Sequence, residues 1–210
     1  RRYHFVNNNT IDLNLKFLTY SKLFTNINND ACGFVKNDVL LQYTHDYTVC
    51  TFAKEKISSY QINNAAETIM SGVASGKDYI GMSPDSSIEY DLGVLKPGEE
   101  KIFNLYIHVS DNSEKNLLND LDQEIERYRK IDLKKELDDT KKYWRKYLKD
   151  HSNIEFKAEG TLKKIYDRTI LLFPLLINEQ TGGISAGVES DEYKTKCGRY
   201  SYCWPRDGAF

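Results

Sequence analysis

The sequence has 210 residues, with 29 basic against 31 acidic side chains, a net charge of −2 and 40% hydrophobic residues. A chain of this length can bury a hydrophobic core without needing disulfides or a bound metal for stability. The near balance of charge gives no global attraction to nucleic acid or to an anionic membrane. The longest apolar run, 170–177, has eight residues, whereas a transmembrane helix needs about 20. We therefore expect neither nucleic acid nor a membrane as a partner.

The two ends of the chain carry no boundary signals. The sequence starts at Arg1 without Met, and no apolar stretch of a signal peptide follows. It stops at Phe210 without a helix stop signal. We expect a piece of a longer protein. Its localisation stays open, with the cytoplasm slightly preferred over secretion.

The charges divide the chain into three parts. Residues 1–110 hold 22 charged side chains, residues 111–150 hold 22 in a much shorter stretch, and residues 151–210 hold 16. The middle part is therefore a heavily solvated element between two ordinary globular stretches. We predict a β-domain over 1–110, a helical linker over 111–150 and the start of another domain over 151–210.

The first part has the pattern of antiparallel β-structure. Alternating or β-branched stretches predict strands near 10–17, 42–44, 47–52, 57–62, 87–92 and 101–109. His45-Asp46 and Lys96-Pro97-Gly98-Glu99 are turn candidates between strands. A parallel sheet would need crossover helices, and the pattern predicts none. An antiparallel sandwich is the expected architecture.

The second and third parts have helical patterns. Apolar residues at helical spacing predict two linked helices, or one bent helix, with a phase change near 131–133. These residues are Leu118, Leu121, Ile125 and Tyr128, then Leu137, Trp144 and Leu148. A further helix over about 162–173 is apolar around most of its circumference, so we expect it to be buried on more than one side. Thr181-Gly182-Gly183 is expected to end it.

The cysteines and histidines give no catalytic or metal-binding pattern. Cys32, Cys50, Cys197 and Cys203 lack zinc-ligand spacing, and we expect free thiols. The histidines, at positions 4, 45, 108 and 151, are scattered. We expect no metal and no cofactor.

The densest group of functional side chains lies at 198–207, with the sequence Gly-Arg-Tyr-Ser-Tyr-Cys-Trp-Pro-Arg-Asp. Aromatic faces stack on sugar rings, and neighbouring Arg and Asp supply directional donors and acceptors for hydroxyl groups. The segment therefore fits a carbohydrate pocket. It equally fits a buried aromatic hinge, in which Asp207 caps a helix that begins at Gly208. The residues alone leave both interpretations open.

The stretch 200–210 resembles the Tyr-x-Tyr-x-Trp-x-Arg-Asp segment of glycoside hydrolase family 15, the glucoamylases, in their bacterial and archaeal branch. Three further stretches resemble parts of that family in the same order. The stretch 92–99 is similar to a late sandwich hairpin, and 166–172 to the first barrel helix. The stretch 181–187 is similar to the Thr-Gly-x-Ile-x-Ala turn. Pro205 and Ala186-Gly187-Val188 depart from many relatives, which leaves the exact substrate open.

The resemblance implies a fold and a set of site residues. The fold would be β plus α, with an antiparallel β super-sandwich, a helical linker and the first helices of an (α/α)6 barrel. Arg206 and Asp207 would bind hydroxyls of the terminal glucose, Trp204 would wall the pocket, and Tyr200 would lie near the ring oxygen. The partners would be an α-glucan or maltooligosaccharide substrate and the remainder of the barrel.

The resemblance also places the two catalytic carboxylates outside this chain, which is therefore expected to be inactive by itself. We interpret the nearby acids Glu179, Glu189, Asp191 and Glu192 as loop residues that favour solvation. The implied activity is release of glucose from non-reducing ends with inversion. Two alternatives stay open: a carbohydrate-binding β-sandwich module, and a relative of the trehalase, glucodextranase or maltose phosphorylase type.

Overall fold

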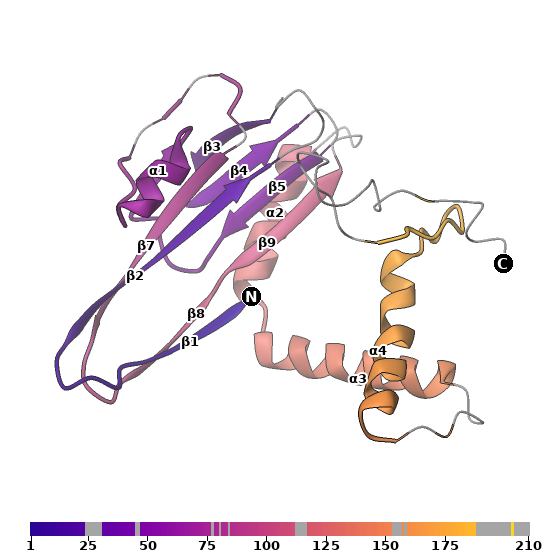
Figure 1. Cartoon of the computed structure of the whole chain (residues 1–210). Helices are drawn as coiled ribbons and strands as arrows, with labels where there is room; N and C mark the ends of the chain where they lie inside the picture. Colours follow the sequence, from indigo (N-terminus) through magenta and orange to yellow (C-terminus); the bar gives the residue numbers. More distant parts are fainter. Residues whose placement is uncertain are drawn as a thin grey trace. The chain divides into compact units, whose positions relative to one another are not determined.

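The computed structural model describes residues 1–23, 31–44, 47–76, 78–79, 81–83, 85–111, 117–152, 157, 159–187 and 203. These residues form antiparallel sheets and four helices, which confirms the mixed β plus α class (Figure 1). The chain divides into two compact units, Arg1–Lys130 and Ile131–Phe210. Among the described residues, no helix has the length and apolar composition needed to cross a bilayer.

The first unit contains all the named strands and two helices. The strands are β1 (Arg2–Val6), β2 (Leu13–Lys22), β3 (Cys32–Lys36), β4 (Val39–Tyr43), β5 (Tyr47–Phe52), β6 (Ser59–Ile62), β7 (Asp85–Leu95), β8 (Glu100–Asn104) and β9 (Tyr106–Asp111). The helices are α1 (Ala65–Met70) and α2 (Leu117–Lys130). The predicted strands near 47–52, 57–62 and 87–92 are confirmed as β5, β6 and β7, and the predicted turn at His45-Asp46 lies outside the described residues.

The strands form three antiparallel groups. Their orders are β1-β8, β2-β7-β6 and β3-β4-β5-β9. Leu40 of β4, Ile88 and Tyr90 of β7 and Phe103 of β8 share one buried core, so side chains from all three groups meet there. The ring of Phe17 on β2 lies 4.7 Å from that of Phe103, measured between centroids. Burial of these apolar faces is the main source of the unit's stability.

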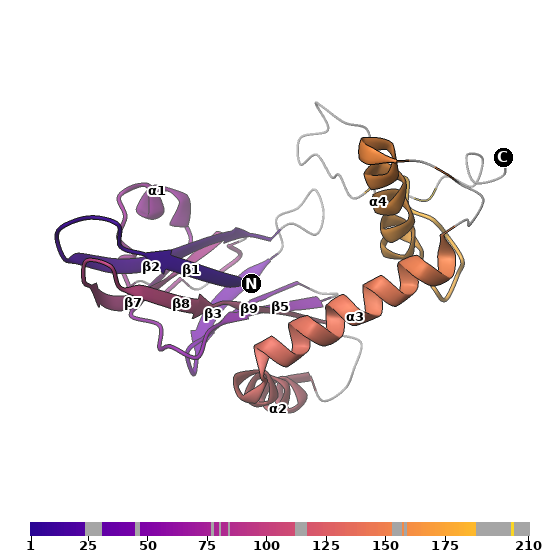
Figure 2. The ribbon, with the colours of Figure 1, turned by 90° about the horizontal axis from the view of Figure 1, so that it is seen from below.

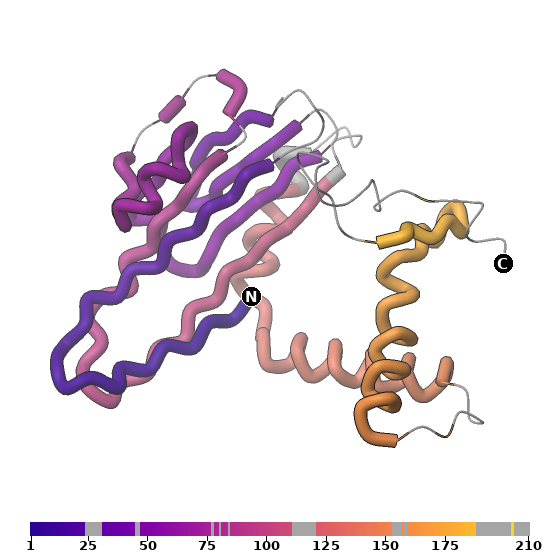
Figure 3. The backbone as a smooth tube through the Cα atoms, viewed as in Figure 1, coloured from indigo at the N-terminus to yellow at the C-terminus, as the bar shows by residue number. Residues whose placement is uncertain are grey.

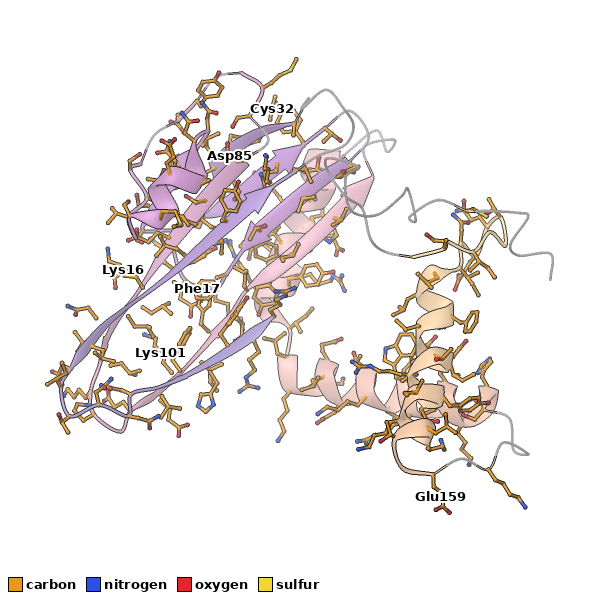
Figure 4. The ribbon with its side chains drawn as sticks, viewed as in Figure 1. Lys16, Phe17, Cys32, Asp85, Lys101 and Glu159 are labelled. Atoms are coloured by element: carbon orange, nitrogen blue, oxygen red, sulfur yellow. The ribbon has the colours of Figure 1, made fainter. Side chains whose placement is uncertain are left out.

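The two helices of the first unit cover different sheets. α1 packs against β7, β2 and β6, whereas α2 packs against β9 (Figure 2). Leu121 and Ile125 of α2 are buried, as the helical spacing of the apolar residues predicts. α1 was not predicted. The backbone N–H of Ala65, at the start of α1, has no acceptor within the helix and donates to the carboxylate of Asp85 at 2.8 Å. Figure 4 shows Asp85 beside α1.

The prediction of one long strand over 101–109 is wrong. The chain leaves β8 at Asn104 and enters β9 at Tyr106, and these two strands pair with β1 and β5 respectively. Leu105, between them, donates its N–H to the Arg1 carbonyl at 2.8 Å and accepts from the N-terminal ammonium at 2.5 Å. The alternating pattern continues through the break, because the break depends on which strands pair and not on the local sequence.

A buried asparagine joins two turns that are distant in sequence. The Asn7 N–H donates to the Glu99 carbonyl at 3.0 Å, and the Gly98 N–H donates to the Asn7 carbonyl at 2.8 Å. The side-chain amide of Asn7 donates to the carbonyls of Ile11 and Leu95, both at 2.8 Å. Figure 3 shows the turn after β1 beside the turn between β7 and β8. Asn7 is 1% exposed, and its bond to the Leu95 carbonyl is shielded from water.

The second unit contains α3 (Leu133–His151) and α4 (Gly160–Leu176), which pack on each other. The predicted phase change is confirmed, because α2 ends at Lys130 and Asp132 caps α3. The Asp132 carboxylate accepts from the N–H groups of Lys134 and Lys135 at 2.9 and 3.3 Å. The domain boundaries at 110 and 150 stay predictions.

Candidate functional site

The candidate site is the turn that follows α4, together with Cys203. The four predicted substrate-binding residues, Tyr200, Trp204, Arg206 and Asp207, lie outside the described residues. Cys203 is the one residue of the segment 200–207 that the structure describes. The contacts described below are therefore those of Cys203 alone.

α4 ends at Leu176, several residues before the predicted stop at Thr181-Gly182-Gly183. Ile177 is already extended, with φ −91° and ψ 130°, and forms an antiparallel bridge with Ile184. The Ser185 N–H donates to the Leu176 carbonyl at 2.8 Å, which satisfies one of the free carbonyls at the helix end. The helix ends at Leu176 because the Leu176 carbonyl accepts from Ser185, which lies beyond the turn, and not because a glycine caps the helix.

The turn between Ile177 and Ile184 is closed by its own hydrogen bonds. The Asn178 carboxamide oxygen accepts from the N–H groups of Gln180 and Thr181, both at 3.0 Å. The Asn178 carbonyl accepts from the Gly182 N–H at 2.8 Å, and the Asn178 N–H donates to the Gly183 carbonyl at 2.8 Å. Gly182 has φ +69°, a conformation that glycine adopts without strain. Asn178 was not singled out in the sequence, although Asn before a Gly-rich turn is a known turn signal.

Cys203 lies against this turn. It forms an antiparallel bridge with Ser185. A Cβ atom added at Gly183 would lie 3.4 Å from the Cys203 sulfur and 3.3 Å from the Thr181 hydroxyl oxygen. Gly183 and Cys203 are therefore within van der Waals range of each other. The structure thus places Cys203 against the stretch 181–187.

Several apolar side chains of α4 are exposed. No described residue of α4 is buried, so the expectation of burial on more than one side is wrong for the described structure. The large exposed side chains of α4 are those of Leu162, Ile165, Leu172, Phe173 and Leu175. The two bridged residues of the turn, Ile177 and Ile184, are exposed as well. This helix has an apolar surface that the described residues leave uncovered.

The described histidines and acids form no second site. His4 pairs with Glu100 at 2.8 Å on an exposed strand pair, and the His151 ring stacks on Tyr147 with 3.9 Å between centroids. His108 lies on β9 with its ring 5.6 Å from that of Tyr128, between centroids. Within the described ranges, no three His, Cys, Asp or Glu side chains gather in a way that could hold a metal ion.

One ion pair, between a half-exposed lysine and a buried carboxylate, was missed in the sequence. The Lys16 ammonium lies 2.8 Å from the Glu89 carboxylate, whose side chain is only 4% exposed. The second carboxylate oxygen of Glu89 accepts from the Ala74 N–H at 3.2 Å. The hydrogen bond and charge of Glu89 raise the pKa of Lys16. These contacts hold the segment after α1 on the sheet, which is a structural and not a chemical role.

The three described thiols, Cys32, Cys50 and Cys203, form no disulfide and differ in exposure. Burial, and to a lesser extent the Asp122 carboxylate, raises the pKa of Cys50 from 9.0 to about 11. We expect folded Cys50 to resist alkylation at pH 8 while exposed Cys203 reacts, measured by peptide-level mass spectrometry. Because the folded state holds this proton more tightly, its contribution to stability is complete below pH 9 and is lost as the pH rises towards 11. Equal alkylation of the two thiols at pH 8 would contradict this assignment.

Comparison with known proteins adds no family assignment, because no protein-family model and no curated protein matches the chain.

Proposed function

We propose that this chain is part of a glucoamylase-like enzyme of glycoside hydrolase family 15, which releases glucose from the non-reducing ends of α-glucans or maltooligosaccharides with inversion. The observation that carries the proposal is the bridge between Ser185 and Cys203. Ser185 belongs to the Thr-Gly-x-Ile-x-Ala stretch and Cys203 to the Tyr-x-Tyr-x-Trp-x-Arg-Asp stretch. Cys203, the one described residue of the second stretch, lies against the first, and this contact supports the proposal that the two stretches belong to one sugar pocket.

The proposed fold is an antiparallel β super-sandwich, a helical linker and the first helices of an (α/α)6 barrel. The antiparallel sheets of the first unit and the packing of α3 on α4 are consistent with this order. A helix of such a barrel has helical neighbours on more than one side. The exposed Leu162, Ile165 and Leu172 of α4 suit contacts with the remainder of the barrel.

The proposed roles follow from the chemistry of the four site residues. Arg206 would donate several hydrogen bonds from one planar group, and Asp207 would accept them from sugar hydroxyls. Trp204 would cover an apolar face of the sugar ring. The Tyr200 oxygen would lie near the ring oxygen, where positive charge develops in an oxocarbenium-like transition state.

This chain would bind the sugar without supplying the reacting carboxyl groups. Inversion requires a general acid and a general base about 6.5–9.5 Å apart, with water between them. The resemblance places both outside residues 1–210. Because this chain would supply binding residues but not the catalytic carboxyl groups, we predict no glucose release by this chain alone.

The test is a substrate panel on the full-length protein that we propose contains this chain. We expect glucose from maltotriose and maltose, without added phosphate. Turnover of trehalose alone would favour a trehalase, and phosphate-dependent turnover would favour a phosphorylase-like relative. Binding of an α-glucan with no turnover of any substrate would favour the binding module instead. Each of these outcomes would overturn the glucoamylase assignment.

A further inference from the structure

We infer that the free edge of β9 is a docking site for one further strand, supplied by the residues that precede Arg1 in the full-length protein. That strand would extend β1 at its N-terminal end and would run antiparallel to β9. The inference goes beyond the proposed sugar chemistry and uses only the proposal that this chain is part of a longer enzyme. It concerns the first unit alone.

β9 is the last strand of its sheet. Among the described strands it pairs with β5 alone, in the order β3-β4-β5-β9. Figures 1 and 2 show β5 and the start of β1 on opposite sides of the chain that runs from β8 into β9. The edge of β9 that faces away from β5 therefore has no described strand beside it. Such an edge presents a row of backbone N–H and C=O groups that can pair with another strand.

The two faces of β9 differ in exposure. The rings of Tyr106 and His108 lie 6.3 and 5.6 Å from that of Tyr128 on α2, measured between centroids, so this face packs against α2. Ile107 and Val109 alternate with them and point to the other face, where they are 55% and 61% exposed. Two β-branched side chains on the open face of an edge strand favour burial under a further segment of chain.

The start of β1 indicates which segment this is. The Leu105 N–H donates to the Arg1 carbonyl at 2.8 Å, and the Arg1 backbone nitrogen donates to the Leu105 carbonyl at 2.5 Å. In an antiparallel pair, such hydrogen-bonded positions recur at every second residue. The backbone groups of Ile107 and Val109 therefore point to the same side as those of Leu105. The chain that precedes Arg1 would run along them.

The register predicts which residues would meet. β1 and β8 pair so that Arg2 lies opposite Asn104. Continued past Arg1, this register places the second residue before Arg1 opposite Ile107 and the fourth opposite Val109. Directly opposite residues of an antiparallel pair share one face, so both positions should hold apolar residues. Charged residues or proline at these two positions would contradict the inference.

The test is hydrogen exchange of the backbone amides of 104–111, followed by mass spectrometry, in the 210-residue chain and in the full-length protein. The matched control is β5, which has a strand on each side in both proteins. We expect exchange in β9 to be at least about 10-fold slower in the full-length protein, because the new bonds would protect alternate amides. Exchange in β5 should be alike in the two proteins.

A substitution gives a second measurement. Val109→Ala should lower the thermal midpoint of the full-length protein by a few degrees, because Val109 would be buried under the further strand. It should leave the midpoint of the 210-residue chain within about 1 °C. The control is Val94→Ala on β7, where the valine is 54% exposed. This control should have no effect in either protein.

Equal exchange of β9 in the two proteins would overturn the inference. Association of the 210-residue chain, with protection of β9 that rises with protein concentration, would assign the edge to a second copy and would overturn it as well. Both measurements are independent of sugar turnover. A full-length protein that hydrolyses no α-glucoside but protects β9 would therefore overturn the proposed function and support this inference.

Discussion

Asp207→Asn in the full-length protein is expected to lower kcat/KM for maltotriose by about 100- to 1,000-fold, which corresponds to about 3–4 kcal/mol of lost transition-state stabilisation. In the proposed pocket, Asp207 accepts hydrogen bonds from glucose hydroxyls as an ionised group. Asparagine keeps the shape but replaces one acceptor oxygen by a donor and removes the charge, so the strongest bonds are lost. The measurement is steady-state kinetics of glucose release.

The matched control is Glu192→Gln, which neutralises a nearby acid that we interpret as a loop residue. It is expected to leave kcat/KM within about 2-fold of wild type, because a solvated surface charge contributes little. If Asp207→Asn were as active as this control, Asp207 would not contact the sugar. The alternative in which Asp207 only caps a helix predicts a loss of stability with little change in kcat/KM for the folded enzyme.

Asn7→Ala is expected to lower the free energy of unfolding of the first unit by about 3 kcal/mol. The side chain makes two donor bonds, to Ile11 and Leu95, and its oxygen accepts from the Asn9 N–H at 3.0 Å. Alanine would remove all three bonds, at about 0.5–1.5 kcal/mol each, and would leave the Leu95 carbonyl without this partner in a buried position. Urea denaturation followed by circular dichroism measures the change.

Asn9→Ala serves as the control for this prediction. Only the backbone N–H of Asn9 takes part in the bond to Asn7, and the Asn9 side chain is exposed. The substitution should therefore change stability by no more than about 0.5 kcal/mol. Equal destabilisation by the two substitutions would show that Asn7 does not join the turns in the way described.

Local sequence patterns predict where the strands and helices of this protein lie better than they predict which strands pair with each other. The β-branched and aromatic residues of β5 and the apolar spacing of Leu121 and Ile125 on α2 are local features, which a sequence displays directly. The capping of α3 by Asp132 is similarly local. The separation of β8 from β9 at Leu105 depends on pairing with β1 and β5, which lie far away along the chain.

The candidate site shows the same difference between local features, which the sequence reveals, and contacts between distant residues, which it does not. The aromatic and charged residues of 198–207 are visible in the sequence as a group of sugar-binding type. The contact of Cys203 with Ser185 is not visible there, because these two residues are far apart in the sequence and meet through a single bridge. The end of α4 at Leu176 was also missed, because the Ser185 N–H that pairs with its carbonyl comes from beyond the turn.

The most direct test of the central proposal is the anomeric form of the first glucose released from maltotriose by the full-length protein. Proton NMR during the first minutes, before mutarotation, distinguishes the two anomers. A glucoamylase-like enzyme attacks the α-linkage with inversion, so we predict β-glucose as the first product. Release of α-glucose, or no release of glucose, would contradict the proposal.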